Sequence, residues 1–301
     1  MAIKADLHMH GPIGFEPYWL RVQGYEGKNL LQLIADRCFK AKLGICAITS
    51  ESDQTDDDNV ILRNSPNDRL GFLVENYLDS LPREYEVDDK FGTNSLVVAK
   101  GNKAVHLING QTVIVRELGK RYDHLVIGSN SVPNSMNIAD TVQYCNDHGL
   151  LHGLEHPALQ SHFGLGFYKA MQVVDQCDFV EGHNAQLRWL RAFSKLPKVG
   201  KKIAPYTRTS NDLAKEFARK NKKHYLANSD AHRIESAGIA SNEFNEGELD
   251  FSSESRLFKT LRSSIIEGNF TTNEGYESIC GWINWVWKFQ RGIRGEQYKQ
   301  E

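Results

Sequence analysis

Two short stretches carry pairs of metal-capable side chains at the same spacing. "HMH" places His8 and His10 two residues apart at the end of the first apolar stretch, and "SDAH" spaces Asp230 and His232 in the same way. Because side chains alternate along a strand, the members of each pair face the same way. Imidazoles and carboxylates are common ligands of divalent metals. The pairs therefore predict a metal site, provided that the fold brings the two ends of the chain together.

Other polar side chains also stand where predicted strands end. Glu51 follows "ICAIT", His156 ends "LLHGLEH", and both Glu181 and Asn184 close "DFVEGHN". His124 is an exception, because it begins the apolar run "HLVIGS". In α/β barrels the carboxyl ends of the strands carry the site, so we expect these side chains to meet at one end of a barrel.

Strand and helix patterns alternate over about 250 residues of the chain. "ICAIT" is typical of a buried strand, "KNLLQLIADRCFKAKLG" has helical spacing, and "SLVVAKGNKAVHLING" predicts a hairpin. "GPIGFEPYWLRVQGYEG" is rich in glycine and proline and predicts a loop. The alternation favours a closed barrel of parallel strands over an open sheet. We expect the barrel over residues 1–272 and a separate tail over residues 273–301.

The tail places three aromatic residues at helical spacing, Trp282, Trp285 and Phe289, with basic residues nearby. Two interpretations stay open. The aromatic stripe packs on the barrel, or the helix binds a membrane surface or a partner protein.

Composition narrows the class of protein. A formal net charge of -2 over 301 residues gives no general attraction to nucleic acid or anionic lipid. The five scattered cysteines form no paired motif, which predicts a reducing compartment. No apolar leader and no long apolar run is present, so we expect neither a signal peptide nor a membrane span. A cytoplasmic protein is the simplest expectation.

The motifs resemble, in order, those of the polymerase and histidinol phosphatase (PHP) family of metal-dependent phosphoesterases. "ADLHMH" is similar to the opening motif, and the later motifs are matched by "LINGQTVIV", "HLVIGSN", "GLEHPAL", "VEGHN" and "ANSDAH". The resemblance covers about residues 3–272. It implies a distorted (β/α)7 barrel that holds one to three divalent ions, either Mn, Zn, Fe or Mg.

The resemblance also implies three groups of metal ligands. They are His8, His10 and Asp230, then His124 and His156, then Glu26, Glu51 and His232. Two positions depart from the family pattern, because Gln111 replaces a bridging glutamate and Glu51 replaces a histidine. A neutral amide bridges two cations poorly, since it brings no negative charge. Glu117, Glu155 or Glu181 could supply the missing carboxylate.

The implied activity is hydrolysis of a phosphate ester by a metal-activated water, with Asp230 and His232 in catalysis. The expected substrate is a small phosphorylated metabolite, a nucleotide or a nucleic-acid end. The residues that we expect to bind it are Gln111, Glu181, Asn184 and Arg188. The departures at Gln111 and Glu51 favour an alternative, a catalytically degenerate barrel that serves as a binding or scaffold module. A third hypothesis is metal-dependent hydrolysis of a C–N bond.

Overall fold

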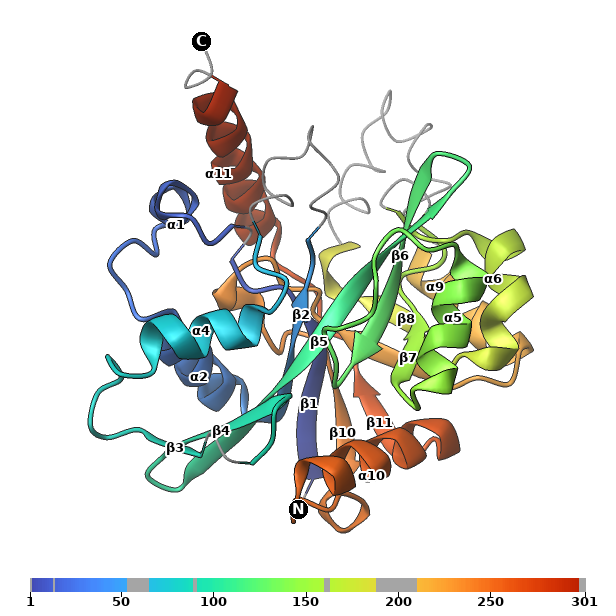
Figure 1. Ribbon diagram of the computed structural model, residues 1–301, viewed down its shortest axis with the longest axis horizontal. Coiled ribbons are helices and arrows are strands. Elements are labelled where there is room, and N and C mark those ends of the chain that lie inside the picture. Colours follow the sequence, from blue (N-terminus) through green and yellow to red (C-terminus); the bar gives the residue numbers. More distant parts are fainter. Residues whose placement is uncertain are drawn as a thin grey trace.

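A mixed β-sheet curls into a nearly closed barrel in the computed structural model of the protein (Figure 1). The structure describes residues 2–12, 14–52, 65–88, 91–159, 163–187 and 210–297. The wall follows the order β1 (Ala2–Met9), β2 (Leu43–Ser50), β5 (Lys103–Glu117), β6 (Lys120–Ile127), β7 (Leu151–Leu154), β8 (Phe179–Asn184) and β9 (Tyr225–Asn228). The predicted fold class, a distorted α/β barrel, is confirmed.

The barrel closes where the chain after β9 meets the end of β1. The backbone N–H of Asp230 donates to the carbonyl of His8 at 2.8 Å, and the N–H of His10 donates to the carbonyl of Ala231 at 3.0 Å. Asp6 is fully buried beside this junction, and its carboxylate accepts from the N–H groups of Ser229 and Gly238. These bonds hold the first strand and the "SDAH" stretch in direct contact.

The prediction of an all-parallel sheet is wrong in part. β6 runs antiparallel to both β5 and β7, because the turn Leu118–Gly119 joins β5 to β6 with positive φ at both residues. A two-residue turn can only reverse the chain, whereas a parallel neighbour needs a long crossover. As a result, β6 begins at the end of the barrel where the other wall strands finish.

Two strands beyond the wall and one hairpin extend the sheet. β10 (Ser241–Asn245) pairs antiparallel with the first half of β1, and β11 (Phe270–Asn273) pairs with β10. The predicted hairpin is present as β4 (Ser95–Lys100) and β5, and β3 (Glu86–Asp88) adds to its edge. The side chain of Asn242 on β10 forms two hydrogen bonds with the backbone of Ala227 on β9. These bonds help to close the barrel in the half where β1 begins.

Helices cover the barrel on opposite sides (Figure 1). α2 (Leu30–Ala41) and α4 (Arg69–Tyr77) lie on one side, and α5 (Ile138–Asp147), α6 (Phe167–Val173) and α9 (Ser210–Lys220) on the other. α10 (Glu254–Glu267) lies near the end where β1 begins. Short 3-10 turns occur at Val174–Gln176, Ala185–Leu187, Ile234–Ser236 and Glu246–Glu248. None of the helices in the described ranges has the length and apolarity needed to cross a bilayer.

The stretch that was predicted to be a loop contains a helix, α1 (Pro17–Gln23). Pro17 supplies a preset φ in the first helical turn, and Gly24 ends the helix at φ 84. The proline and glycine therefore mark the ends of a short helix rather than its absence.

The tail forms α11 (Ile279–Gln297), which packs against α1. The hydroxyl of Tyr18 donates to the carbonyl of Gly292 at 3.0 Å, and Lys288 Nζ donates to the carbonyl of Gln23 at 2.8 Å. Gly292 allows this approach, because a Cβ there would lie 2.2 Å from the Trp19 ring. Of the two interpretations of the aromatic stripe, the structure supports packing on the barrel.

The packing around His106 on β5 can be tested through the pH dependence of stability, because its imidazole ring lies among aromatic side chains. Its ring lies between Phe91 and Phe251, at centroid distances of 4.9 and 4.7 Å. Burial lowers its pKa to about 4 against the attraction of Asp88, whereas the unfolded chain binds a proton near pH 6.5. Stability therefore falls as the pH drops from 6.5 toward 4, because the unfolded state then binds more protons.

We predict that the His106→Gln variant loses less unfolding free energy between pH 7 and pH 5 than the wild type does. The difference should be about 1 kcal/mol, a value that is reduced because the ring is partly exposed to solvent. Urea unfolding at both pH values measures this difference. An unchanged loss in the variant would show that the ring titrates normally in the folded protein.

Candidate metal centre

A cavity of about 340 Å³ opens at the end of the barrel where β1, β2, β7 and β9 finish. Its volume is in the range of small-molecule sites. Its charged and imidazole lining comes from five wall strands and the residues that follow them: His10, Glu51, Asp123, Glu155, His156, Asp230 and His232. The fully buried His8 adjoins this lining, so the cavity gathers four carboxylates and four imidazoles.

The two histidines of the first strand meet the aspartate that follows β9. His8 Nε2 lies 2.9 Å from His10 Nε2, and Asp230 Oδ1 lies 3.5 Å from the former and 3.2 Å from the latter. One ligand atom from each of the three residues therefore lies within reach of a single cation. The metal site predicted from the sequence depends on this contact between His8 and His10, near the start of the chain, and the distant Asp230.

A second group adjoins the first through His10. Its Nδ1 lies 3.4 Å from Glu51 Oε2, and its ring lies 4.4 Å from that of His232. Two buried arginines hold this part in place. Arg69 donates to the carbonyls of His10 and Glu51, and Arg121 donates to the Glu51 carboxylate.

A third group contains Asp123, Glu155 and His156. Glu155 Oε1 lies 3.2 Å from His156 Nε2 and 3.6 Å from His8 Nε2, so this carboxylate stands between the first and third groups. Among the three glutamates considered from the sequence, Glu155 is the one that lines the cavity. Glu117 instead pairs with Lys169.

The donor set fits divalent cations. Several buried ligand atoms have no hydrogen-bond partner within the described part of the chain: His10 Nδ1, Glu155 Oε2, His156 Nδ1 and Asp230 Oδ1. Such atoms are costly unless a cation or water satisfies them. Mixed nitrogen and oxygen ligands suit Mn, Fe and Zn. The backbones of His156 and Asp230 also lie at φ 24 and 47, a strained region that is typical of functional sites.

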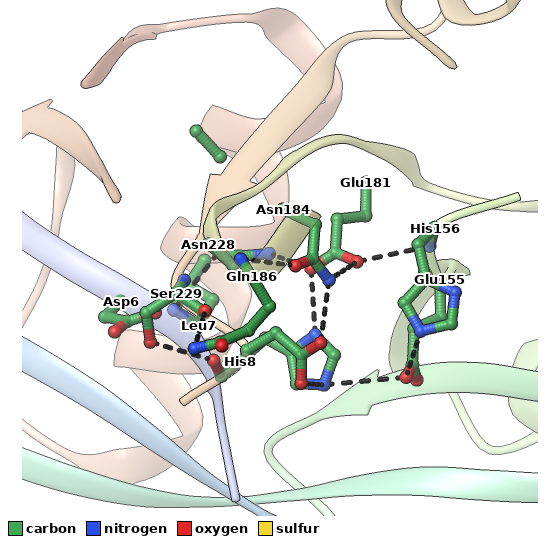
Figure 2. A network of polar contacts seen from close by, with 12 residues as sticks. Asp6, Leu7, His8, Glu155, His156, Glu181, Asn184, Gln186, Asn228 and Ser229 are labelled. Atoms are coloured by element: carbon green, nitrogen blue, oxygen red, sulfur yellow. Dashed lines mark hydrogen bonds and ion pairs between the residues drawn. The ribbon is translucent and has the colours of Figure 1, made fainter. Parts of the chain in front are cut away.

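A buried network orients the ligands from behind (Figure 2). Glu181 Oε1 accepts from His8 Nδ1 at 2.8 Å and from Asn228 at 3.1 Å, which directs His8 Nε2 toward His10 and Asp230. Asn184 donates to Asp230 Oδ2 at 2.9 Å and to Glu181 Oε2 at 3.3 Å. Glu181 and Asn184, expected to bind substrate, therefore lie behind the ligands rather than on the cavity wall.

The charges in the cavity are strongly coupled. Burial favours the neutral form of Asp230, but His8 and His232 outweigh it and hold the pKa of Asp230 well below its usual range. Burial likewise disfavours protonated His8, yet Glu181, Glu155 and Asp230 raise its pKa well above 6.5. Burial raises the pKa of Asp123 to about 7, although Arg121 opposes the shift. In the absence of a cation, protonated imidazoles and Arg121 therefore balance much of the carboxylate charge.

Three residues of the predicted set lie away from the cavity. His124 Nε2 bonds His152 Nδ1 at 2.9 Å, in a buried layer that includes Cys177. Neighbouring side chains on a strand point to opposite faces, so on the reversed β6 it is Asp123 that faces the cavity. Glu26 is exposed and pairs with Arg21 at 2.9 Å. Gln111 is bonded through both amide atoms to the backbone of Val132. Arg188 lies outside the described residues.

Arg69, Arg121 and Asp123 were not predicted as site residues from the sequence. The only signal for Asp123 was its place next to the out-of-pattern His124 in "YDHLV". Neither arginine stands at a predicted strand end. Arg69 begins α4, and Arg121 lies near the start of the reversed strand β6.

Comparisons with known proteins agree with the PHP resemblance. A family model described as PHP-associated matches residues 208–264, a segment that contains Asp230 and His232. No curated protein matches the chain.

Three solved structures are similar. PsfC from Pseudomonas syringae has a TM-score of 0.55 at 10% identity, with 97% of this chain and 98% of that one covered. A lesion-specific endonuclease from Pyrococcus furiosus has a TM-score of 0.45 at 15% identity, with 90% of this chain and 58% of that one covered. A two-domain protein from Bacteroides vulgatus that contains a predicted PHP-like metal-dependent phosphoesterase has a TM-score of 0.48 at 12% identity, with 91% and 65% covered.

The match to PsfC shows a shared fold over nearly the whole of both chains. This chain spans less than two thirds of the other two. The resemblance to PHP proteins predicted from the sequence is confirmed by the match of the PHP-associated model to the segment that carries "SDAH".

A pair of carboxylate variants tests the centre. We predict that Asp230→Asn lowers Mn²⁺ affinity at least tenfold, because it removes the charge that faces His8 and His10. Glu26→Gln should leave the affinity unchanged, because Glu26 lies on the surface with Arg21. Isothermal titration of both variants with Mn²⁺ measures the difference. Equal affinities in the two would rule out Asp230 as a ligand.

Proposed function

We propose, with the PHP resemblance as the premise, that this chain hydrolyses a phosphate ester by a metal-activated water. The observation that carries the proposal is the convergence of His8, His10 and Asp230 at the cavity, where their ligand atoms lie 2.9–3.5 Å apart. One divalent ion would be held by these residues. Further ions would be held by His10, Glu51 and His232, and by Asp123, Glu155 and His156.

The residues of the chain fill defined roles in this proposal. A bound divalent cation supplies hydroxide near neutral pH and neutralises charge on the phosphoryl oxygens. Glu181 and Asn184 hold His8 and Asp230 in the orientation that ligation needs. His232 donates from Nδ1 to the Asp230 carbonyl at 3.0 Å, so only Nε2 remains for the reaction. When no ion is held by His10, Glu51 and His232, this Nε2 would exchange a proton with the leaving oxygen.

The scaffold alternative rests on the departures at Gln111 and Glu51, and the contacts of Gln111 weaken the first of these two arguments. Gln111 is bonded to Val132 and does not line the cavity, while Glu155 offers a carboxylate between two ligand groups. The position of Glu155 supports the proposal that its carboxylate supplies the negative charge that Gln111 lacks. Among the described residues that line the cavity, none specifically favours C–N bond hydrolysis.

The finer expectations from the sequence belong to this proposal. They are one to three divalent ions with Mn²⁺ as the first to test, and a small phosphorylated or nucleotide substrate. They also include a barrel over residues 1–272 with a tail over residues 273–301. A cytoplasmic location is proposed from the five unpaired cysteines, of which four are buried.

We predict that the Mn²⁺-loaded protein hydrolyses p-nitrophenyl phosphate or its diester, and that Glu155→Gln lowers kcat/KM at least 100-fold. The reason is that the variant removes the charge between His8 and His156. Glu117→Gln is the matched control, because Glu117 pairs with Lys169 away from the cavity.

Two results would contradict this proposal. Absence of any metal-dependent hydrolysis with Mn²⁺, Zn²⁺ or Fe²⁺ would favour the scaffold alternative. Equal activities of the two glutamine variants would remove Glu155 from the mechanism.

A further inference from the structure

Part of the cavity lining is apolar and has no role in holding metal ions. It consists of Leu159, Phe163, Trp282, Trp285, Val286 and Phe289. Most of these side chains belong to α11, which rises from the end of the barrel that carries the metal centre (Figure 1). We call these six residues the aromatic wall.

The aromatic wall is anchored rather than loosely placed. The rings of Trp285 and Phe289 stack at 5.6 Å with an interplanar angle of 10°. Phe289 in turn contacts Trp19 of α1 at a centroid distance of 6.3 Å, and Trp19 is almost fully buried. With the Tyr18 and Lys288 bonds to the opposite helix, this packing fixes the aromatic faces in position.

The wall and the metal centre are continuous. The Trp285 ring meets the His232 ring edge-on at 5.6 Å, so a ligand held against the wall lies next to the proposed proton donor. Trp285 Nε1 is buried without a hydrogen-bond partner in the described ranges, which leaves a donor unused in the free protein. Phe163 stays 45% exposed although it lines the cavity, with the Arg121 guanidinium 4.3 Å from its ring centre.

We propose that the aromatic wall binds a planar aromatic group of the substrate while the metal centre holds its phosphate. This inference rests on the proposed phosphoesterase function and narrows it to small nucleotides and aryl phosphates. Stacking on aromatic side chains is favourable for any nucleobase, whereas a sugar phosphate offers no flat face. A cavity of about 340 Å³ suits one small molecule and not a nucleic-acid duplex.

The test compares two ligands that differ only by the base. Isothermal titration in the presence of Mn²⁺ measures the affinity for AMP and for ribose 5-phosphate, and a third titration uses 1-naphthyl phosphate. We expect AMP to bind about tenfold more tightly than ribose 5-phosphate. If 1-naphthyl phosphate binds as tightly as AMP, the aromatic wall recognises any flat aromatic group. If AMP binds more tightly, the wall recognises the nucleobase itself.

Leucine variants separate stacking from the packing of α11. Trp285→Leu and Phe289→Leu keep an apolar side chain toward the barrel but remove the flat face, so each should weaken AMP binding about fivefold or more. Both should leave ribose 5-phosphate binding unchanged. Trp287→Leu is the control, because Trp287 lies on the same helix, is 57% exposed and does not line the cavity.

The inference is overturned if AMP and 1-naphthyl phosphate bind no more tightly than ribose 5-phosphate. It is also overturned if the leucine variants weaken all three ligands equally while circular dichroism shows intact folding. Hydrolysis is scored separately. A protein that binds AMP through Trp285 but cleaves no ester retains the aromatic subsite and loses the proposed function. If the wild type and the leucine variants cleave all three esters equally, the protein retains the proposed function and lacks the aromatic subsite.

Discussion

The backbone junction between the end of β1 and the chain after β9 is the constraint on which the site depends. The bonds from Asp230 to His8 and from His10 to Ala231 close the barrel at the level of the ligands. They bring an imidazole pair from the start of the chain against a carboxylate from near its end. The buried Asp6 reinforces the junction through Ser229 and Gly238. Without this closure the same residues would lie on two separate sheet edges.

Charge balance explains how so many ionisable groups share one cavity. Asp230 and Glu51 stay ionised, with pKa values below the usual range, because imidazoles and Arg121 offset the cost of burial. Glu181 accepts a hydrogen bond from His8, and Asn184 donates one to Asp230, both on the side away from the cavity. The ligand atoms are therefore oriented before a cation arrives, which reduces the ordering that binding must supply.

The sequence predicted those parts of the site that depend on strand ends and alternation. His8, His10, Glu51, His156, Asp230 and His232 meet as expected, since each stands where a strand running in the common direction finishes. His124 does not, because its side chain bonds His152 on the opposite face of β6, whereas Asp123 shares the inner face with Leu125 and Ile127. Glu26 was placed by family resemblance alone and Gln111 by that resemblance and its place after a predicted strand, and local partners hold both away from the cavity. Helical spacing identified Trp282, Trp285 and Phe289 as an aromatic stripe, but their position on the cavity, like that of the two arginines, depends on tertiary packing.

An anomalous difference map from crystals soaked in MnCl₂ tests the central claim most directly. The account predicts a manganese peak within about 2.5 Å of ligand atoms from His8, His10 and Asp230 together. Manganese bound only at surface carboxylates, with no density among these three side chains, would contradict it.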